Sequence, residues 1–212
     1  MIYNNYRYIY PPRPKNSIPP DELDFWDNDT LVSQPKLNGS NCIIFTNGIE
    51  SFVMNRHNQK MVNFKLTKNE ILSLYKGNGW MVINGEYMNK SKKDKYDQIF
   101  NHKFVIFDIL VYNSDYLIGK TFKERINLIN KLYNINNKSN DSEFLYKISD
   151  NIYFVKSYYE NFKSLYNSII SIDMYEGLVL KRKNAKLEIV SSSSNNHKSQ
   201  LKCRKPTKNY KY

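Results

Sequence analysis

Apolar residues in this chain fall mostly into short runs that alternate with polar residues or stop at turn residues, a pattern typical of β-strands. Asn47-Gly48 is the strongest short hairpin signal and lies between two such runs. Lys36 lies at the end of the first predicted strand. The predicted strands span residues 31–37, 42–46, 49–55, 177–182, 187–190 and 200–204.

Helical periodicity appears in three further segments, and two of them begin with a capping signal. Thr67 is followed three residues later by Glu70, and Thr121 by Glu124, which is the spacing of a capping box. The predicted helices span residues 68–76, 122–133 and 160–172. Strands and helices in irregular order, with no internal repeat, predict an α+β chain.

The remaining segments are irregular, with one exception. Residues 10–20 hold five of the seven prolines, which favours an extended lead-in over a helix or a central strand. Residues 134–142 read as a polar loop, and residues 191–196 as a flexible connection. Residues 104–110 are nearly all apolar, as in a strand that is buried on both faces.

Composition indicates a folded protein in a reducing compartment. The 212 residues are 41% apolar and 15% aromatic, enough for one large or two small domains. No apolar stretch approaches a membrane span, and the first sixteen residues lack a signal-peptide core. Cys42 and Cys203 provide neither a disulfide framework nor metal-ligand spacing. A soluble, cytoplasmic protein without a membrane partner is expected, in the host cytoplasm if the source is viral.

Positive charge is concentrated at the end of the chain. Residues 181–212 carry ten lysines and arginines and one acid, Glu188, which is +9 of the formal net charge of +12. AT-rich codons supply lysine as well as asparagine, isoleucine and tyrosine, so the total charge alone is weak evidence. A charged tail in solvent and a surface that binds a polyanion both remain open at this point.

Lys36 is the first candidate for chemistry. It lies within Gln34-Pro35-Lys36-Leu37-Asn38-Gly39-Ser40-Asn41, and an apolar run comes directly after this segment. A lysine beside a small turn and between apolar residues is partly desolvated, which favours the neutral, nucleophilic form of its amine. The spacing K-x-x-G recurs by accident, so the interpretation depends on the segments further along the chain.

Five further segments occur downstream in a fixed order, and the whole set resembles a known superfamily. They are Asn55-Arg56-His57, Asn84-Gly85-Glu86-Tyr87, and residues 104–110, 176–181 and 201–206. With the Lys36 segment, they resemble motifs I, Ia, III, IIIa, IV and V of the covalent nucleotidyltransferases, which include ATP-dependent DNA ligases, RNA ligases and mRNA-capping guanylyltransferases. The resemblance runs from about Lys36 to Lys205.

The residues after Lys36 resemble one branch of this superfamily most. Gly39, Ser40 and Asn41 are similar to the glycine, small hydroxyl residue and asparagine of the RNA ligase 2 branch of T-even bacteriophage. DNA ligases and capping enzymes usually carry an aspartate in place of Asn38. The resemblance implies an α+β nucleotidyltransferase (adenylation) domain, with two antiparallel sheets flanked by helices around a nucleotide-binding cleft.

The resemblance also implies a reaction. Lys36 would attack the α-phosphate of ATP to form lysyl-AMP. AMP would pass to a 5′-phosphate of RNA or DNA, and a 3′-hydroxyl would then displace it. Lys181, Lys202 and Arg204 would supply cations at the phosphates, with Lys202 also counted as catalytic.

Two acids and four further residues receive roles in the same way. Glu176, as a catalytic residue, and Glu86 would face Mg²⁺, or Mn²⁺ in its place, although Glu86 would alternatively hold the ribose hydroxyl. The nucleotide-binding group also includes Gln34 at the base edge, Asn41 after the nucleophile, Arg56 at the ribose or the acceptor phosphate, and Phe107 stacked on the base.

Each of these assignments has a structural alternative. Without the resemblance, Phe107 reads as a core residue, since its run has the composition of a buried strand. Arg56, Glu86 and Glu176 would otherwise be ordinary surface charges. The three histidines do not form a ligand cluster in the sequence.

Two departures from the family pattern limit the expected activity. Arg204 stands where a lysine is usual. The expected division is a lead-in over residues 1–30 and a nucleotidyltransferase domain over residues 31–212, with no separate C-terminal domain. Such a domain would be either complete and minimal or supplied with an accessory protein in place of the C-terminal domain. An ATP-dependent RNA ligase is the expected function. A capping guanylyltransferase, a minimal DNA ligase and a non-catalytic nucleic-acid-binding module are the alternatives.

Overall fold

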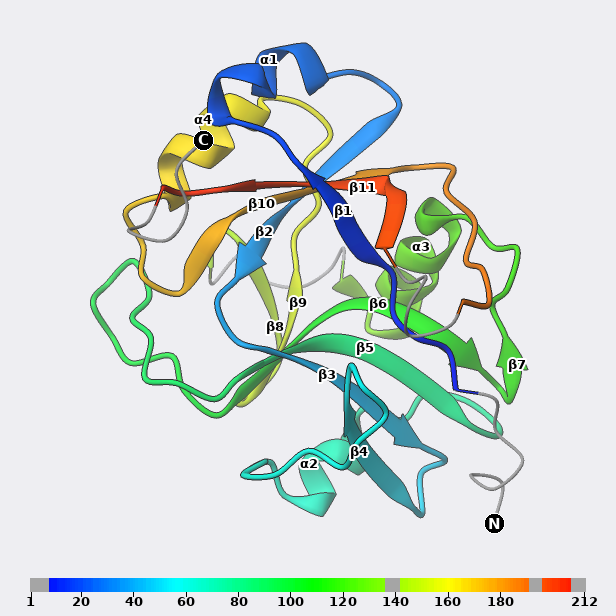
Figure 1. Ribbon diagram of the computed structural model, residues 1–212. Helices are drawn as coiled ribbons and strands as arrows, with labels where there is room; N and C mark the ends of the chain where they lie inside the picture. The colour runs from blue at the N-terminus through cyan, green and yellow to red at the C-terminus, as the bar shows by residue number, and fades with distance from the viewer. Residues whose placement is uncertain (1–7, 136–141, 191–195, 207–212) are drawn as a thin grey trace.

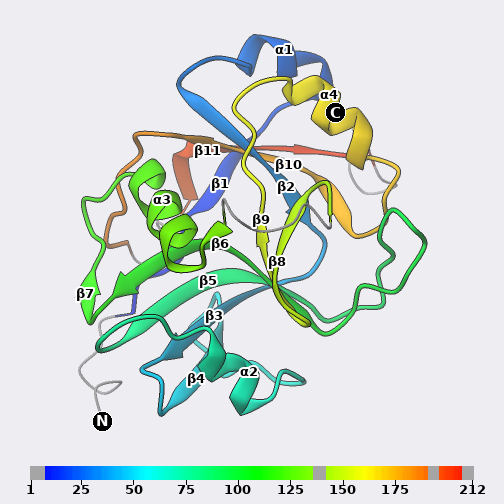
Figure 2. The same ribbon diagram turned by 180° about the vertical axis from the view of Figure 1, so that it is seen from behind.

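The fold is known from a computed structural model, which describes residues 8–135, 142–190 and 196–206. Two β-sheets face each other in Figure 1, a four-stranded sheet above and a seven-stranded sheet below, and most helices lie on their outer sides (Figures 1 and 2). The α+β expectation is confirmed.

The four-stranded sheet has the order β1-β11-β10-β2. Its strands are β1 (Arg13–Ser17), β2 (Leu31–Leu37), β10 (Tyr175–Arg182) and β11 (Asn196–Arg204). The β10 strand pairs antiparallel with β2 and β11, whereas β1 runs parallel to β11 at the edge. The expected extended lead-in is therefore partly an edge strand, where prolines are tolerated because one side of the strand needs no hydrogen-bonded neighbour.

The seven-stranded sheet has the order β4-β3-β5-β6-β9-β8, with β7 paired to β6. Its strands are β3 (Ser40–Thr46), β4 (Ser51–Asn55), β5 (Met81–Met88), β6 (Lys103–Tyr112), β7 (Asp115–Tyr116), β8 (Leu145–Ser149) and β9 (Ile152–Val155). The β6 and β9 strands are parallel. Each sheet thus contains one parallel pair in addition to the antiparallel pairs that were expected.

Helices cover the outer faces of both sheets. Both capping boxes are present, at Thr67 with Glu70 and at Thr121 with Glu124, and each helix begins directly after its threonine. The helices are η2 (Pro20–Glu22), α1 (Leu23–Trp26), α2 (Lys68–Ser73), α3 (Phe122–Leu132) and α4 (Phe162–Ile169). One apolar cluster packs α4 and α1 against the four-stranded sheet, and a second packs α2 and α3 against the seven-stranded sheet.

Several boundaries differ from those expected. Residues 187–190 do not form a strand: Leu187 is buried and makes only an isolated bridge to Ile118, since no extended strand lies beside it. The loop of the β3–β4 hairpin has four residues, because the Asn47 side chain accepts hydrogen bonds from the amides of Ile49 and Glu50. Residues 136–141 and 191–195, which hold most of the expected loop and connection, lie outside the described residues.

A buried ion pair fixes α3 to the seven-stranded sheet. Arg125 donates to both carboxylate oxygens of Asp108 on β6, at 2.8 and 2.9 Å, and both side chains are 4% exposed. We expect Arg125→Met to lower the free energy of unfolding by about 3–5 kcal/mol, because it leaves a buried carboxylate without its partner. Urea unfolding measures this loss. The double variant Asp108→Leu, Arg125→Met should lose clearly less unfolding free energy than Arg125→Met alone. An equal loss in the two variants would contradict the explanation.

Candidate active site

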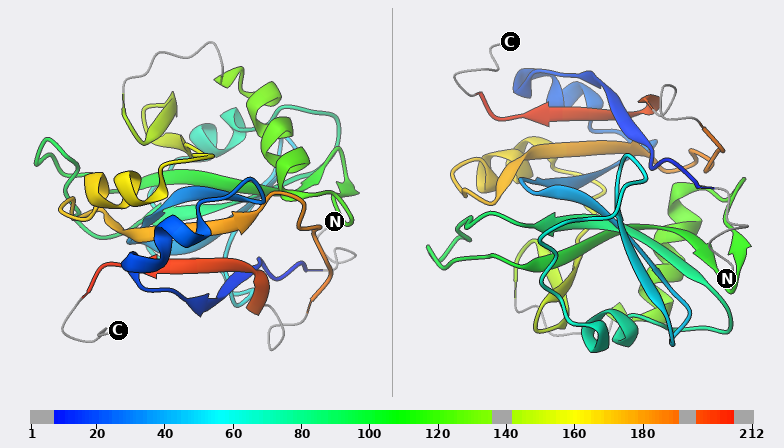
Figure 3. Two further views of the ribbon diagram at one scale, coloured as in Figure 1. Left: turned by 90° about the horizontal axis from the view of Figure 1, so that it is seen from above. Right: turned by 60° about the horizontal axis from the view of Figure 1, so that its bottom comes forward.

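The register of the four-stranded sheet gathers the cationic residues on one face. Lys36 pairs with Gly177, and Gly177 with Arg204, while Val179 lies between Gln34 and Lys202. Since side chains alternate between the two faces of a strand, the polar residues at these positions point to the same side. That side faces the seven-stranded sheet, because residues of both sheets line one cleft; Figure 3 shows the two sheets lying one over the other.

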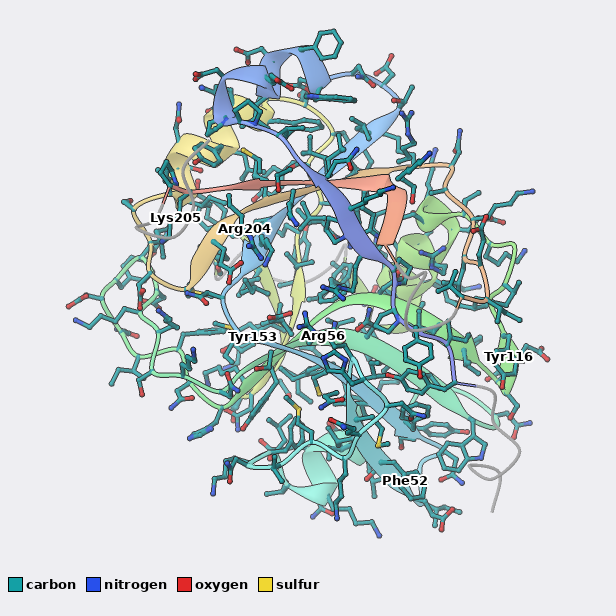
Figure 4. The ribbon with its side chains drawn as sticks, in the orientation of Figure 1. Phe52, Arg56, Tyr116, Tyr153, Arg204 and Lys205 are labelled. Atoms are coloured by element: carbon teal, nitrogen blue, oxygen red, sulfur yellow. The ribbon has the colours of Figure 1, made fainter. Side chains whose placement is uncertain are left out.

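A cleft of about 460 Å³ lies between the sheets, and every sequence-predicted site residue lines it. In Figure 4, Arg204 lies on the four-stranded sheet and Arg56 lies at the edge of the seven-stranded sheet, on opposite sides of this cleft. The predicted residues found there are Gln34, Lys36, Asn41, Arg56, Glu86, Phe107, Glu176, Lys181, Lys202 and Arg204.

Gly177 allows the central strands to approach each other beside Lys36. Its φ is +133°, and a Cβ atom at this position would overlap the carbonyl oxygen of Cys203 on β11. Only glycine fits this position without moving the backbone. The glycine that follows Glu176 in the sequence is therefore required by strand packing.

Lys36 and Glu176 form the centre of the site. The Lys36 Nζ donates to Glu176 Oε2 at 2.5 Å, and the two side chains are 20% and 27% exposed. Arg204 Nε lies 3.5 Å from the same carboxylate oxygen. The lysine is thus partly desolvated, as its sequence context predicted, and its amine faces a carboxylate and a guanidinium.

Asn38 links this pair to the loop after β5. With its amide nitrogen toward Glu176, it donates to Glu176 Oε1 at 3.1 Å and its oxygen accepts from Lys92 Nζ at 3.2 Å. Lys92 also pairs with Asp173 at 3.0 Å. An amide is the group that satisfies both neighbours, because it has a donor for the carboxylate and an acceptor for the ammonium.

Glu86 faces the same centre from β5. Its Oε1 accepts a hydrogen bond from the backbone amide of Gly39 at 3.2 Å. Burial raises the pKa of Glu86 to about 7, Lys36 opposes this shift and Glu176 adds to it. The carboxyl group therefore exchanges its proton near neutral pH.

This shift predicts a pH-dependent gain in stability for Glu86→Gln. A carboxyl whose pKa rises from 4.5 unfolded to about 7 folded contributes stability below pH 4.5 that is lost as the pH rises through 7. The variant does not lose this stability as the pH rises. Its free energy of unfolding should therefore exceed that of the wild type by up to about 3 kcal/mol at pH 8 and by much less at pH 5. Urea unfolding at both pH values measures the gap, with the exposed Glu188→Gln as control. A gap of the same size at both pH values would rule this explanation out.

Phe107 reaches the cleft because of a β-bulge. Asn84 pairs with Asp108 and Gly85 pairs with Ile106, so Phe107 is the extra residue on β6. A bulge redirects the side chain of the extra residue, and Phe107 is partly exposed in the cleft while both neighbours are buried. Phe107 also packs against the apolar cluster beside the four-stranded sheet, so its ring contacts the core on one side and the cleft on the other.

Lys181 lies beneath this ring and bonds to Gln34. Its Nζ lies 4.8 Å from the centroid of Phe107 and 4.6 Å from that of Phe122. It donates to Gln34 Oε1 at 2.7 Å, and Gln34 Nε2 donates to Ser157 Oγ at 3.0 Å. Burial lowers the pKa of Lys181 to about 8. Gln34 is 2% exposed and its amide is engaged on both sides, so reading a base edge would require it to exchange these bonds.

Asn41 and Arg56 occupy the side of the cleft formed by β3 and β4. Asn41 Nδ2 donates to Asn84 Oδ1 at 2.9 Å, while its Oδ1 is buried and accepts no hydrogen bond from the described residues. Arg56 Nε donates to His57 Nε2 at 3.0 Å. An unsatisfied buried acceptor that lines a cleft fits a site for a polar ligand.

Among the described residues, Glu86 and Glu176 are two carboxylates that could bind a metal ion, but they do not form a complete set of ligands. The described residues contain no group of three or more histidine, cysteine, aspartate or glutamate side chains able to hold an ion. Glu86 and Glu176 both line the cleft and act on each other electrostatically. Two hard oxygen ligands, with water and phosphate oxygens for the rest, fit the way Mg²⁺ binds at nucleotide sites.

Asn84, Gln200 and Arg13 are among the other lining residues, and the sequence reasoning gave them no role. Asn84 and Gln200 lie two positions before Glu86 and Lys202 on the same strands, so strand periodicity was a usable signal for them. Arg13 lines the cleft from β1, and nothing in its local sequence indicated this.

The two sheets enclose a cleft with a lysine–carboxylate pair at its centre, and comparisons with known proteins identify the family of this domain. The family model of the ATP-dependent DNA ligase domain matches residues 17–199. The chain belongs to this family, so it is an ATP-dependent ligase nucleotidyltransferase domain. A search of curated proteins found no significant match.

Solved structures with the same fold are ligase domains of low sequence identity. The ligase domain of LigD from M. tuberculosis aligns with a TM-score of 0.57 and 12% identity, over 82% of this chain and 53% of that one. A mycobacterial DNA ligase D complexed with ATP and MES aligns with a TM-score of 0.58 and 11% identity, over 91% of this chain and 60% of that one. A Lig E DNA ligase aligns with a TM-score of 0.57 and 14% identity, over 94% of this chain and 70% of that one. The chain thus spans little more than half of the first two structures.

In the part of the chain that the structure describes, no helix is long and apolar enough to cross a membrane.

Proposed function

We propose that this chain is the catalytic domain of an ATP-dependent polynucleotide ligase that forms lysyl-AMP on Lys36. The position of Lys36 supports the proposal best: its Nζ lies in the cleft, 2.5 Å from Glu176, on the sheet face shared with Lys181, Lys202 and Arg204. A nucleophilic lysine needs this combination of partial burial and neighbouring cations.

In the first step, the Lys36 amine attacks the α-phosphorus of ATP. A bond forms between nitrogen and phosphorus, the bond from that phosphorus to the bridging oxygen breaks, and pyrophosphate leaves. Glu176 is the carboxylate placed to take the proton that the amine loses. Lys202 and Arg204 stabilise the charge that develops on the α-phosphate.

Glu86 and Glu176 are the proposed ligands of Mg²⁺, directly or through water. The ion would neutralise phosphate charge when ATP is bound. The buried Oδ1 of Asn41 and the partly exposed ring of Phe107 offer a polar contact and a stacking face to the nucleoside.

In the remaining steps, AMP passes from Lys36 to a 5′-phosphate, and a 3′-hydroxyl then attacks that phosphate and releases AMP. RNA is our first choice for the acceptor, because Gly39-Ser40-Asn41 resembles the RNA ligase 2 branch. Within this segment, Ser40 Oγ accepts from Asn89 and Gly39 donates to Glu86, so it joins the nucleophile to β5.

DNA is the second candidate, and the family match favours it, since the matching model is that of a DNA ligase domain. The two candidates differ at the 3′-terminal sugar, because a 2′-hydroxyl can be read as both donor and acceptor. An accessory protein or a further domain of the whole protein is a proposed partner for gripping the acceptor strand.

Two assays test these proposals in sequence. Incubation with each α-labelled nucleoside triphosphate and Mg²⁺ should give an acid-labile covalent label from ATP. Label from GTP alone would favour a guanylyltransferase, and no label from any nucleotide would favour a non-catalytic binding module.

The second assay measures joining on a nicked duplex with a 5′-phosphate. A 3′-terminal ribonucleotide should be joined about tenfold faster than a 3′-terminal deoxyribonucleotide. The reverse preference would identify a DNA ligase.

A further inference from the structure

A second pocket, of about 410 Å³, lies outside the active-site cleft and shares no lining residue with it. Its walls are the segment between β5 and β6 (residues 89–102), the β8–β9 hairpin and the residues that lead into β10. The 89–102 segment extends beyond the seven-stranded sheet on the left of Figure 1, and Figure 2 shows it beside β8 from behind. The proposed reaction makes no use of this pocket.

Aromatic rings form much of the pocket. The lining residues with aromatic side chains are Tyr96, Phe100, Phe144, Tyr153 and Tyr175. Phe144 and Tyr175 are buried, with ring centroids 5.6 Å apart. Tyr153 is only partly buried, and its ring centroid lies 5.0 Å from that of Phe100. Tyr96, on the 89–102 segment, is exposed. The rings of Tyr153 and Tyr96 are therefore accessible to a ligand.

Lys103 places a positive charge beside these rings. Its Nζ lies 5.8 Å from the ring centroid of Tyr153 and 5.9 Å from that of Phe100. It donates to the backbone carbonyl of Asp150 and to the side-chain oxygen of Asn151, and both of these acceptors are neutral. Within residues 8–135, 142–190 and 196–206, Lys103 forms no salt bridge. Its charge is therefore available to an anion at the pocket.

Two more lysines line the pocket, and each forms an ion pair at the surface. Lys147 on β8 pairs with the exposed Asp150 at 2.8 Å, and Lys95 pairs with the exposed Glu143 at 3.3 Å. Such pairs contribute little, and an ammonium has two further donors, so each lysine can also bind an anion. Of the described residues that line the pocket, only Asp94 is acidic, and its Oδ1 accepts from two amides of its own turn.

A planar ring attached to a phosphate fits this combination best. The bases of a single strand stack on aromatic side chains while lysines bind the backbone, and every base has a face suited to such stacking. A base in a duplex is already stacked and paired, and freeing it costs a few kcal/mol. An apolar peptide would contact the rings but would leave the lysines without a role.

The pocket and the active site lie on either side of one strand end. Tyr175 lines the pocket, and the next residue on β10, Glu176, lines the cleft. Met174 also lines the pocket, and its carbonyl oxygen accepts from the backbone amide of Asn38 at 2.9 Å. A ligand in the pocket would therefore be bound next to the segment that carries the active-site carboxylate.

We propose that this pocket binds an unpaired nucleotide of a single-stranded nucleic acid, with the base against Tyr153 and Tyr96 and the phosphate at Lys103 and Lys147. Binding of the strand does not depend on lysyl-AMP formation. Its use, which is to hold an unpaired end or overhang during joining, rests on the ligase function proposed above.

The first measurement is the dissociation constant for a labelled single-stranded RNA of about twelve nucleotides, obtained by fluorescence anisotropy, beside that for the same strand annealed to its complement. Tyr153→Leu should weaken single-strand binding about tenfold, as expected when one base loses its stacking partner, and should change duplex binding less than about twofold. Tyr153→Phe keeps the ring and should bind like the wild type. Tyr116→Leu is the matched control, because Tyr116 lines neither pocket and lies away from Tyr153, on the right of Figure 4.

The second measurement is the salt dependence of single-strand binding in Lys147→Gln, which leaves the packing of the rings intact. The slope of log binding constant against log salt should become shallower by about 0.7, the value for one phosphate contact on a single strand. Lys131→Gln, at an exposed position of α3 outside both pockets, should keep the wild-type slope.

Thermal unfolding shows whether each variant folds, and if Tyr153→Leu does not, the slope of Lys147→Gln decides alone. If Tyr153→Leu binds the single strand as Tyr116→Leu does, the proposal is wrong and an apolar peptide becomes the favoured occupant. An equal loss for single strand and duplex, or an unchanged slope in Lys147→Gln, would also contradict it. Neither measurement requires ATP, so failure of the ligase function would be seen separately, as absence of covalent label.

Discussion

Lys36→Arg is expected to fold normally and to take no covalent label from ATP, a loss of at least about a thousandfold. The guanidinium can still pair with Glu176 across the 2.5 Å contact that Lys36 makes, so the local structure should persist. An arginine stays protonated, however, and has no lone pair available for attack on phosphorus. Gel analysis after incubation with α-labelled ATP and Mg²⁺ measures the label.

Thermal unfolding provides the control for this variant. A melting temperature close to that of the wild type, with no label, identifies Lys36 as the nucleophile. Label of equal intensity in the variant would show that another residue is modified, and peptide mapping of the acid-labile adduct would then locate it.

Glu176→Gln should slow lysyl-AMP formation by roughly a hundredfold, the size expected when a charge that acts on the transition state is lost. Glutamine keeps the shape of the side chain but cannot accept the proton from Lys36 or carry the charge that faces Arg204. Single-turnover labelling at saturating ATP separates this rate effect from weaker binding.

The stability of this variant should change little. The Glu176 side chain is 27% exposed, and a pair with that much solvent contact contributes less than about 1 kcal/mol. A fall in unfolding free energy that parallels the fall in rate would make Glu176 a structural residue. Glu188→Gln, at an exposed position outside the cleft, should match the wild type in both measurements.

The sequence predicted elements whose signals are local. The capping boxes at Thr67 and Thr121 begin helices because their hydrogen bonds join residues three apart. The strand that ends at Leu37 was placed correctly because its alternation and its turn lie side by side in the chain. The ten predicted site residues line one cleft for a related reason, since the fixed order of motifs carried the tertiary arrangement with it.

What the sequence could not predict depends on contacts between distant segments. The parallel pairing of β1 with β11 joins residues 13 and 196, and no local pattern encodes such a register. The same pairing is what brings Arg13 to the cleft. The bulge at Phe107 could not be predicted for a similar reason, because its run is nearly all apolar and only the mismatch with β5 shows which residue is extra. The strand predicted at residues 187–190 was wrong because Leu187 is buried without a neighbouring strand. A buried residue in a loop gives the same apolar signal as one in a strand.

The hydrogen bonds of Asn38 have a consequence for how related sequences should vary. Its amide satisfies a carboxylate on one side and an ammonium on the other, so the choice between asparagine and aspartate at this position is tied to Lys92 and Glu176. An aspartate here would place a second carboxylate beside Glu176, whereas loss of Lys92 would remove the need for an acceptor. Positions 38 and 92 should therefore change together among relatives that keep Glu176. The identity of residue 38 is then set by the charge of a neighbouring loop, and under the proposed ligase function it is a poor marker of the nucleic acid that is joined.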